Sequence, residues 1–429
     1  MSATSFIDRQ ISQIRQGGQA TVFGKMKRVL LRLLGLPMYI LVIPVVVVIR
    51  LIRPWMLVRM GLLRSGSIGH FGANTELYLC ERDACINKPT QRHVDIFHLE
   101  SIVCNQQLLT MWKRALHIWP AWLLAPIARV NGLIPGGTIH EVGGNSQGPM
   151  DVHNLLDRFL THLHFTDEEV ARGEAGLRAM GIPAGTSFVC LIARDAAYLS
   201  SHRPGEDFSY HHFRDSDIQS YVLAAEELAE RGYFVIRMGS KVLKAMETSH
   251  PRVIDYAGNG MRSDFLDIYL GANCAFCITS GTGWDAIPQM SRRPLVCVNW
   301  VTLGYVFTSR ADYLTIPKKL VLQGSQKTMT LQEIFSHGVG LSQNGYEYKS
   351  KGIGLVENTP EEIRDVAVEM AERLNGTWQP REDDETLQKR LWEIFPKGIT
   401  DPYRRRPLHG EIRARFGAAF LRNNRAWLQ

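Results

Sequence analysis

The chain has 429 residues, of which 45% are hydrophobic and 21% charged, proportions that exclude wholesale disorder and, at this length, predict more than one domain. The formal net charge is +7, but residues 1–64 hold ten Lys or Arg against one acid, Asp8, so residues 65–429 hold 39 basic and 41 acidic groups. This slightly acidic body excludes a nucleic-acid binder, which would need a basic face on its folded part.

The basic arm contains the longest uncharged apolar run of the chain, the seventeen residues 33–49. This length is at the short limit for crossing a bilayer, and Pro37 and Pro44 interrupt the run. Because Lys or Arg flanks both ends, we expect an anchor that dips into the cytoplasmic leaflet of the inner membrane, with its cations at anionic headgroups. A single crossing of the membrane and a buried helix of the soluble body are the alternatives. A cleaved signal peptide is not expected, because no small-residue cleavage site follows.

The seven cysteines are an odd number without the spacing of a disulfide framework, which predicts reduced thiols and a cytoplasmic protein. Cys274 and Cys277 have the spacing of a redox or zinc pair. They lie in an apolar run without a second pair nearby, so we interpret them as small buried hydrophobic residues.

After the arm, residues 55–63 have strand character and lead directly into the glycine-rich segment 64–74 and an apolar-periodic stretch. Strand, glycine loop and helix in this order are typical of the start of a nucleotide-binding half-domain, here expected to extend to residue 165. Thr166 and Glu169 form a capping box at the start of the next helix, which ends at Gly181.

From residue 187 onward, predicted strands and helices alternate. Helices are expected to start at Ser216 or Asp217, at Ser263 and at Thr359. The predicted strands are 187–193, 233–238, 253–256, 274–278 and 295–299. This alternation predicts a parallel sheet with helices on both faces.

The predicted fold class is therefore α/β, with two Rossmann-like half-domains facing each other across a cleft and an N-terminal membrane-associated helix. The expected domains are the arm 1–54, the half-domains 55–165 and 166–375, and C-terminal helices 376–429 that pack back on the N-terminal half.

One loop of the second half-domain has the composition of a phosphate-binding turn. The segment TSGTG, residues 279–283, follows a predicted strand and precedes a helix that starts near Trp284. Loops at the carboxyl ends of parallel strands line the ligand crevice, and glycines let the backbone approach a phosphate closely. The residues concerned are Thr279, Ser280, Gly281, Thr282 and Gly283. Similar loops also serve packing alone.

Two arginines at other strand ends favour the phosphate interpretation. Arg194 ends the strand in VCLIARDAAYL, and Arg237 precedes Gly239 at the end of another. A guanidinium at a strand end can grip a diphosphate with two hydrogen bonds and stabilise a leaving nucleotide. The alternative for Arg194 is a surface ion pair with Asp195 or Asp217. Three strand ends of this kind predict a nucleotide-diphosphate ligand.

With these motifs, the chain resembles a family of bacterial glycosyltransferases found with surface-polysaccharide genes. The matching segments are CNQQLLTMWKR (104–114), VCLIARDAAYL (189–199), FRDSDIQSY (213–221), GYFVIRMGS (232–240), IDYA (254–257), SDFLDIYL (263–270), ITSGTGWDAIP (278–288) and ENTPEEI (357–363). More distantly, Arg194 and the TSGTG loop are similar to the His-x-Arg and Ser/Thr-Gly motifs of the fucosyltransferase superfamily. Ile192 stands where that superfamily has the His.

The resemblance implies a GT-B enzyme with an N-terminal acceptor domain and a C-terminal donor domain. Such an enzyme would move a sugar from a nucleotide-diphosphate sugar to a lipid-linked cell-surface glycan, without a metal or another cofactor. The sequence agrees, because Asp215-Ser216-Asp217 is better interpreted as a helix cap than as a metal motif, and His202, His211 and His212 as a solvated loop. The alternative function is a non-catalytic sugar-nucleotide or glycan-binding subunit of a membrane-bound polysaccharide assembly complex, which Ile192 favours.

The resemblance also suggests roles for individual residues. His70 and Glu76 are the candidates for the general base, and Arg194 contacts the donor diphosphate. On the donor side we place Arg194, Asp195, Arg237, Gly239, Asp255, Tyr256, Ser263, Asp264 and the TSGTG loop, with Asp255, Tyr256, Ser263 and Asp264 reading base and ribose. On the acceptor side we place Gly69, Asn74, Asn105, Gln106 and Lys113.

Overall fold

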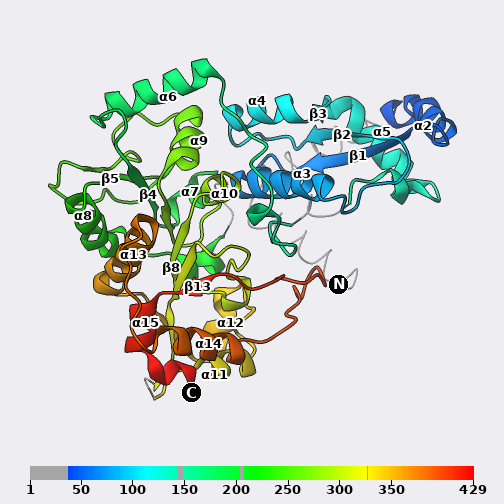
Figure 1. The fold of residues 1–429 in the computed structure, drawn as a ribbon. Coiled ribbons are helices and arrows are strands. Elements are labelled where there is room, and N and C mark those ends of the chain that lie inside the picture. The colour runs from blue at the N-terminus through cyan, green and yellow to red at the C-terminus, as the bar shows by residue number, and fades with distance from the viewer. Residues whose placement is uncertain (1–36, 144–147, 203–206, 326) are drawn as a thin grey trace, which may run out of the picture. The chain divides into compact units, whose positions relative to one another are not determined.

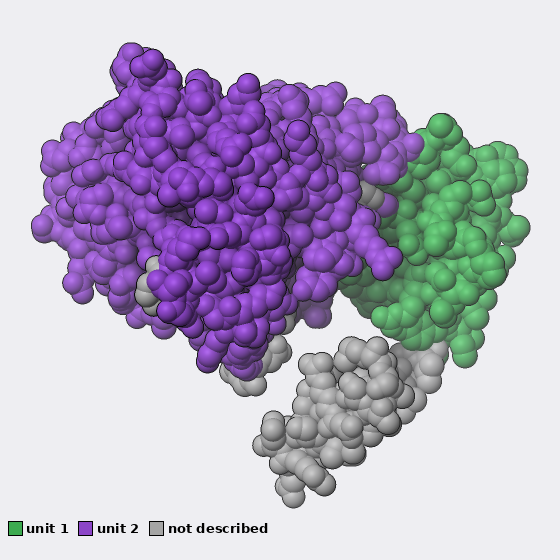
Figure 2. All heavy atoms as spheres, turned by 90° about the horizontal axis from the view of Figure 1, so that it is seen from below, with its two compact units in different colours: residues 1–62, 89–99, 117–142 green, residues 63–88, 100–116, 143–429 purple. Residues whose placement is uncertain are grey.

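The computed structural model describes residues 37–143, 148–202, 207–325 and 327–429 (Figure 1). The chain forms two compact units, coloured separately in Figure 2. Unit 1 consists of the residues up to 62 together with 89–99 and 117–142, and unit 2 of residues 63–88, 100–116 and 143–429. The domain boundaries expected at residues 55, 166 and 376 stay predictions.

Unit 1 has a small three-stranded sheet of order β1-β2-β3, formed by Leu57–Leu63, His93–Leu99 and His117–Ile118. Its helices are α2 (Ile43–Leu51), α5 (Ala121–Leu133) and the 3₁₀ turn η2 (Gly137–His140). The core includes Val46 of α2, Leu124 and Ile127 of α5, and Met60 and Ile96 of the sheet. The strand predicted over 55–63 is confirmed, and it begins at Leu57. Among the described residues, no helix has the length and apolar character needed to cross a membrane.

Unit 2 is built on a seven-stranded parallel sheet of order β13-β9-β8-β7-β4-β5-β6. The first of these strands in the chain, β4, lies inside the sheet. Strands β5 and β6 follow on one side of β4, and β7, β8 and β9 follow on the other. This is the strand order of the doubly wound Rossmann sheet, so the predicted α/β class with a parallel sheet is confirmed for this unit. The strands are β4 (Phe188–Ile192), β5 (Phe234–Arg237), β6 (Val253–Ile254), β7 (Cys277–Thr279), β8 (Leu295–Trp300), β9 (Tyr313–Pro317) and β13 (Arg415–Phe416).

The predicted strand 274–278 is wrong at its start, since β7 begins only at Cys277. The amide of Cys274 donates a hydrogen bond to the carbonyl of Leu270, so Cys274 is the C-cap of the preceding helix, Asp264–Asn273. Both cysteines are buried and free, as are Cys190 and Cys297 in neighbouring strands, which confirms their interpretation as hydrophobic residues.

Helices cover both faces of this sheet. On one side α8 (Val222–Glu230) packs against α13 (Pro360–Asn375), and on the other α9 (Asp264–Asn273) packs against α10 (Ala286–Met290) (Figure 1). The predicted starts are confirmed at Ser263 and at Thr359, and Asp217 caps the 3₁₀ turn that leads into α8. The capping box of Thr166 and Glu169 is also present, at the start of α6.

The rest of unit 2 surrounds this sandwich. Residues 376–429 add β13 to the edge of the sheet and place α15 against α13. A small antiparallel sheet has the order β11-β10-β12, formed by Lys327–Thr328, Lys319–Leu322 and Ile353–Val356. The remaining elements are the π-helical turn η1 (His70–Asn74), α3 (Thr75–Asp83), α4 (Gln106–Ala115), η4 (Leu155–Asp157), α6 (Asp167–Ala179), α7 (Ala197–His202), η5 (Ser209–Arg214), η6 (Ile218–Tyr221), η7 (Leu303–Tyr305), α11 (Leu331–Ser336), α12 (Gly345–Ser350), α14 (Asp384–Ile394), α15 (Ala418–Asn423) and η8 (Arg425–Leu428).

Two buried asparagines fix the carboxyl end of β8. The side chains of Asn299 and Asn358 each accept a hydrogen bond from the other's backbone amide, both at 2.6 Å. Asn358 also donates to the carbonyl of Pro317 at 2.8 Å, and Asn299 to the hydroxyl of Tyr221 at 3.2 Å. Asn299 has φ of 52°, a left-handed conformation that asparagine tolerates better than most residues. This pair joins β8, β9 and the entry of α13.

Replacing Asn358 by Leu should lower the free energy of unfolding by about 2–4 kcal/mol, because it leaves the buried amide of Asn299 and the carbonyl of Pro317 without partners. Urea denaturation measures this change. The control is Asn375→Leu at the exposed end of α13, where only a long contact with the Tyr233 hydroxyl is lost. Equal effects of the two substitutions would contradict the role given to Asn358.

Candidate functional site

The candidate site lies where the strand order of the large sheet reverses, between β4 and β7. Ile192 is paired with Thr279 in the ladder, and the amide of Ser280 donates to the carbonyl of Ile192 at 3.3 Å. The hydroxyl of Ser280 accepts from the amide of Arg194 at 2.8 Å. The carboxyl ends of the two strands are therefore joined, and the structure places Arg194 beside the TSGTG loop. In open α/β sheets this is the position where ligands bind.

Gly281 of the TSGTG loop is needed for steric reasons, and Gly283 lies at a close contact with another loop. Gly281 has φ of 80°, and a Cβ atom there would lie 3.1 Å from the ring of Trp300. Gly283 packs against the first glycine loop, where a Cβ atom on Gly69 would lie 3.0 Å from the carbonyl oxygen of Gly283. The buried carboxylate of Asp285 accepts from the Thr279 hydroxyl at 3.2 Å and so holds the loop from its far end.

A second arginine, Arg214 of η5, also reaches this loop. Its guanidinium donates to the carbonyl of Gly281 at 2.6 Å. Burial and the neighbouring charge of Arg194 lower the pKa of Arg214 to about 10. Burial likewise lowers the pKa of Arg194, against the opposing effect of Asp215. Two partly buried cations therefore lie close together, which favours an anionic ligand.

A cavity of about 190 Å³ opens beside the loop. Its wall includes Ser280, Gly281, Thr282, Arg214, His211, Asp285, Phe213, Trp300, Thr302 and Tyr305. The buried atoms Nδ1 of His211 and Oγ1 of Thr282 have no hydrogen-bond partner, and neither has Nε of Arg194, which lies 3.5 Å from Asp215. Unpartnered buried polar atoms are rare in folded proteins, so those of His211 and Thr282 in this wall, and that of the nearby Arg194, are candidates for contacts with a polar ligand.

The protonation state of His211 follows from the same surroundings. Burial, followed by the charges of Arg194 and Arg214, lowers the pKa of His211 to about 4. At neutral pH its ring is therefore uncharged and can donate one hydrogen bond to an anion. The expectation that His211 belongs to a solvated loop is wrong, because its side chain is half-buried in the cavity wall. The side chain of His202 lies outside the described residues.

A larger cavity of about 560 Å³ lies next to the first, and Phe213 lines both. Its wall carries mixed charges from Asp195, Asp215, Asp217, Arg237, Lys244, Lys318 and Glu357. Lys244 pairs with Asp217 at 2.8 Å, and Lys318 donates to the carbonyl of Asp215 at 2.6 Å. The volume is in the range of cavities that bind small molecules.

Four further donor-side residues lie at the carboxyl ends of β4, β5 and β6. Arg237 is only 2% exposed and forms an ion pair with Asp255 at 3.0 Å, so each of these side chains already has a charged partner. Gly239 has φ of 157°, and a Cβ atom there would lie 2.7 Å from Val242. The carboxylate of Asp195 accepts from the amides of Ala197 and Leu243. Of these residues, Arg237 and Asp195 line the larger cavity.

A third group of predicted residues forms the contact between α4 and α9. The side chain of Asn105 donates to the carbonyl of Asp264 at 2.9 Å, and the amide of Gln106 donates to the Asp264 carboxylate at 2.8 Å. Ser263 caps α9, and its amide donates to the buried hydroxyl of Tyr256 at 3.0 Å. The structure thus brings residues of the predicted acceptor and donor sides together, but neither cavity described above is lined by them.

The remaining acceptor-side residues lie on the first glycine loop and on α4. His70 is half-buried, and its Nδ1 lies 3.3 Å from the side-chain oxygen of Asn74. Burial lowers the pKa of His70, so its imidazole is neutral at physiological pH. Gly69 directly precedes it and contacts Gly283 of the TSGTG loop. Lys113 is exposed on α4.

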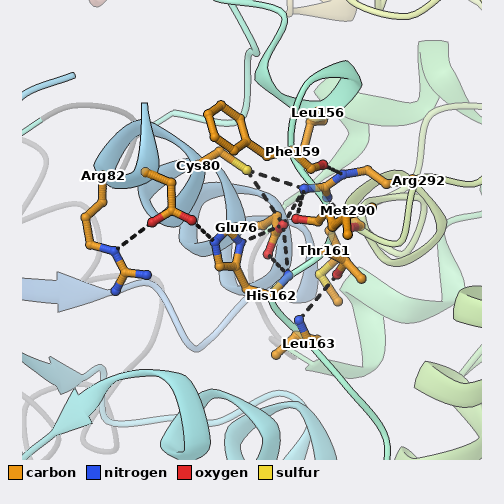
Figure 3. A network of polar contacts seen from close by, with 12 residues as sticks. Glu76, Cys80, Arg82, Leu156, Phe159, Thr161, His162, Leu163, Met290 and Arg292 are labelled. Atoms are coloured by element: carbon orange, nitrogen blue, oxygen red, sulfur yellow. Dashed lines mark hydrogen bonds and ion pairs between the residues drawn. The ribbon is translucent and has the colours of Figure 1, made fainter. Parts of the chain in front are cut away.

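Glu76, the other candidate base, is fully buried in an ion-pair network (Figure 3). Its carboxylate lies 2.6 Å from the guanidinium of Arg292 and 3.1 Å from Nδ1 of His162. The ligand atoms of Glu76, Cys80 and His162 lie within 4.8 Å of one another, as a metal site requires. Arg292 also donates to the sulfur of Cys80 at 3.4 Å, so a guanidinium already supplies the positive charge at this position. Burial raises the pKa of the Cys80 thiol, which keeps it protonated and unsuited to a metal.

Three residues of the small cavity were missed by the sequence analysis, namely His211, Arg214 and Asp285. Arg214 lies in the segment FRDSDIQSY and Asp285 directly follows the TSGTGW motif, so both were within recognised motifs. No local pattern shows that η5 folds back over a loop nearly seventy residues later, and only the tertiary structure reveals it.

Removing the Arg292 side chain should destabilise the protein by about 3–5 kcal/mol, because it leaves the buried Glu76 carboxylate with too little compensating charge. Chemical denaturation of Arg292→Ala measures this loss. The control is Arg293→Ala, which removes a neighbouring arginine whose side chain donates to the carbonyl of Ala272. A loss equal to that of the control would show that the network contributes little.

The stability of the protein should depend on pH through Asp285. Burial raises the pKa of Asp285 to about 7, from an ordinary value of about 4, so between these values the folded state binds more protons than the unfolded state. The contribution of Asp285 to stability therefore falls as pH rises from about 4 to about 7, by at most about 1.4 kcal/mol per pH unit. The difference in unfolding free energy between the parent and Asp285→Asn, measured across this range, should show that slope and level off above pH 7. A difference that does not change with pH would contradict it.

Comparison with known proteins identifies glycosyltransferases of low similarity. No protein-family model and no curated protein sequence matches the chain. Among solved structures, the E. coli ADP-heptose LPS heptosyltransferase II is 13% identical, with a TM-score of 0.38 over 60% of this chain and 90% of that one. A family 9 glycosyltransferase from Veillonella parvula is 11% identical, with a TM-score of 0.39 over 61% and 86%. An E. coli heptosyltransferase solved with ADP-2-deoxy-2-fluoro heptose is 12% identical, with a TM-score of 0.29 over 60% and 92%. Each of these three solved structures is a glycosyltransferase.

Proposed function

We propose that the chain is a GT-B glycosyltransferase that moves a sugar from a nucleotide-diphosphate sugar to a lipid-linked cell-surface glycan. The observation that carries the proposal is the convergence of Arg194, Arg214 and the TSGTG loop at the point where the strand order reverses. This is the place where a doubly wound sheet binds nucleotides, and here it is cationic, rich in donors and incompletely hydrogen-bonded.

In this proposal the diphosphate binds in the smaller cavity. Arg194 and Arg214 neutralise its charge, and the hydroxyl of Thr282 and the neutral ring of His211 donate to its oxygens. When the bond to the sugar breaks, negative charge builds up on the departing nucleoside diphosphate, and the two fixed guanidinium groups stabilise it. The adjacent larger cavity takes the nucleoside. The proposal includes no metal or other cofactor, because the two arginines can supply the positive charge that the leaving group requires.

Of the two candidate bases, the surroundings favour His70. Its lowered pKa leaves it neutral and able to accept the proton of the acceptor hydroxyl. Glu76 has no exposed surface and is paired with both Arg292 and His162, so an acceptor could reach it only after that network opened. We therefore propose His70 as the base and Glu76 as a residue that supports the packing of α3.

The proposed location is the cytoplasmic face of the inner membrane, where a lipid-linked acceptor would be held at the surface. The basic arm and its apolar run support this location. The competing function, a non-catalytic subunit that binds a sugar nucleotide or a glycan, is favoured by one observation. Ile192, at the position of the superfamily His, is a buried residue at the end of β4 and offers no polar group to a ligand.

Binding of nucleoside diphosphates to the full chain tests the proposal. We expect one of ADP, UDP, GDP and CDP to raise the melting temperature, by the equivalent of about 2.7 kcal/mol at a hundred times its dissociation constant. Arg194→Ala should reduce this shift because it removes a positive charge. Arg214→Lys should also reduce it, because lysine keeps the charge but cannot donate two parallel hydrogen bonds to one phosphate. Arg178→Ala is the matched control, since Arg178 is 55% exposed on α6. If no diphosphate stabilises the folded parent, donor binding by this chain is refuted.

Turnover then separates the enzyme from the non-catalytic subunit. An enzyme should slowly hydrolyse the sugar nucleotide that carries the stabilising base, and Arg214→Lys should slow this reaction. A protein that binds the diphosphate but neither hydrolyses nor transfers any sugar would support the non-catalytic function.

A further inference from the structure

The exposed side of helix α2 is apolar, and the packing of unit 1 does not account for these exposed apolar side chains. Val42, Val46 and Ile49 form its buried stripe and pack against α5. The residues between and around them are exposed and entirely aliphatic, namely Ile40, Leu41, Ile43, Val45, Val47, Val48 and Leu51. A helix at the surface of a soluble protein carries polar residues on its outer face, whereas residues 40–49 contain none.

Further large apolar side chains of unit 1 are exposed as well, and three of them are tryptophans. Trp122, at the start of α5, is 65% exposed, Trp119 just before it 48%, and Trp55, shortly after α2, 75%. Leu133 at the end of α5 is 80% exposed. Since α2 and α5 pack against each other, Trp122 and Leu133 belong to the same two-helix element as α2, while Trp55 and Trp119 lie just outside its helices in the chain (Figure 1). Tryptophan prefers the boundary between water and lipid, because its ring is apolar and its N–H is polar.

The charge of the chain indicates what covers this surface. Ten of its Lys and Arg residues and one acid lie in residues 1–64, which include α2. An anionic lipid surface would be attracted by these charges, while the arms of two copies meeting through the same face would repel each other. An apolar helix that follows a cationic segment in the sequence has the composition of a segment that lies in the interfacial plane of a membrane.

We propose that α2 and the flanks of α5 form a bilayer-docking surface, in which the aliphatic side chains of α2 enter the lipid and Trp55, Trp119 and Trp122 lie at the headgroup level. This inference rests on the membrane location in the proposed function, and it adds α5 and the tryptophans to the apolar run recognised in the sequence. It does not depend on nucleotide binding.

Flotation of the full chain with vesicles tests the surface. The protein should float with vesicles of phosphatidylethanolamine and phosphatidylglycerol, and less well with phosphatidylcholine alone or at high salt. The double substitution Trp119→Gln/Trp122→Gln should weaken binding by about tenfold or more, since two large apolar groups no longer enter the interface. Leu133→Gln should weaken it severalfold. The matched control is Leu160→Gln, which changes an equally exposed leucine of unit 2 (86%) and should have no effect.

The melting temperature of each variant with and without the stabilising nucleotide shows that it is folded, so failure of membrane docking can be told apart from failure of donor binding. Vesicle binding by the double variant equal to that of the parent would overturn the proposal, as would equal effects of Leu133→Gln and Leu160→Gln. If the parent binds no vesicles and instead forms a dimer that the same tryptophan substitutions dissociate, the partner of this surface is a second copy.

Discussion

The site is defined by two partly buried arginines that the protein does not fully neutralise. Burial lowers the pKa of both guanidinium groups, the charge of Arg194 lowers that of Arg214 further, and the nearby carboxylates oppose these shifts only in part. Asp215 lies 3.5 Å from Arg194 without a hydrogen bond to Nε, and burial holds the pKa of Asp285 near 7, so this second carboxyl is largely protonated below neutrality. Burying charge costs free energy unless a counter-charge is present. In the proposed function, a bound diphosphate would supply that counter-charge.

The sheet topology explains how these groups meet. Because β4 and β7 are neighbours in the sheet but are separated in the chain by β5 and β6, their carboxyl ends bring residue 194 and residues 279–283 to one point. The hydroxyl of Ser280 then bonds to the amide of Arg194, so the loop and the arginine are positioned by the same contact. Gly281 leaves room for Trp300 on one side while its carbonyl receives the guanidinium of Arg214 on the other. The arrangement of Arg194, Arg214 and the TSGTG loop thus results from the strand order together with a few small side chains.

Local patterns predicted much of this fold, because capping boxes and apolar periodicity depend on neighbours in the chain. The helix starts at Thr166, Ser263 and Thr359 and the strand that ends before Arg194 are examples. The same patterns could not show which polar side chains are used inside the protein. Asp255 carries a charge at a strand end, yet it serves as the partner of Arg237. His211 lies in a polar stretch that resembles a solvated loop, yet it lines the cavity, because η5 folds over a loop far away in the sequence.

The contact between Gly69 and Gly283 bears on the catalytic role proposed for His70. Since a Cβ atom on Gly69 would lie 3.0 Å from the carbonyl oxygen of Gly283, a larger residue at position 69 would force the first glycine loop and the TSGTG loop slightly apart. His70 follows Gly69, and both loops belong to unit 2, as does η1, which packs against α10. The proposed base, His70, and the TSGTG loop are therefore parts of the same compact unit. The distance between them does not depend on where unit 1 lies. A mechanism that needs base and leaving group on opposite sides of one sugar ring requires such a fixed separation.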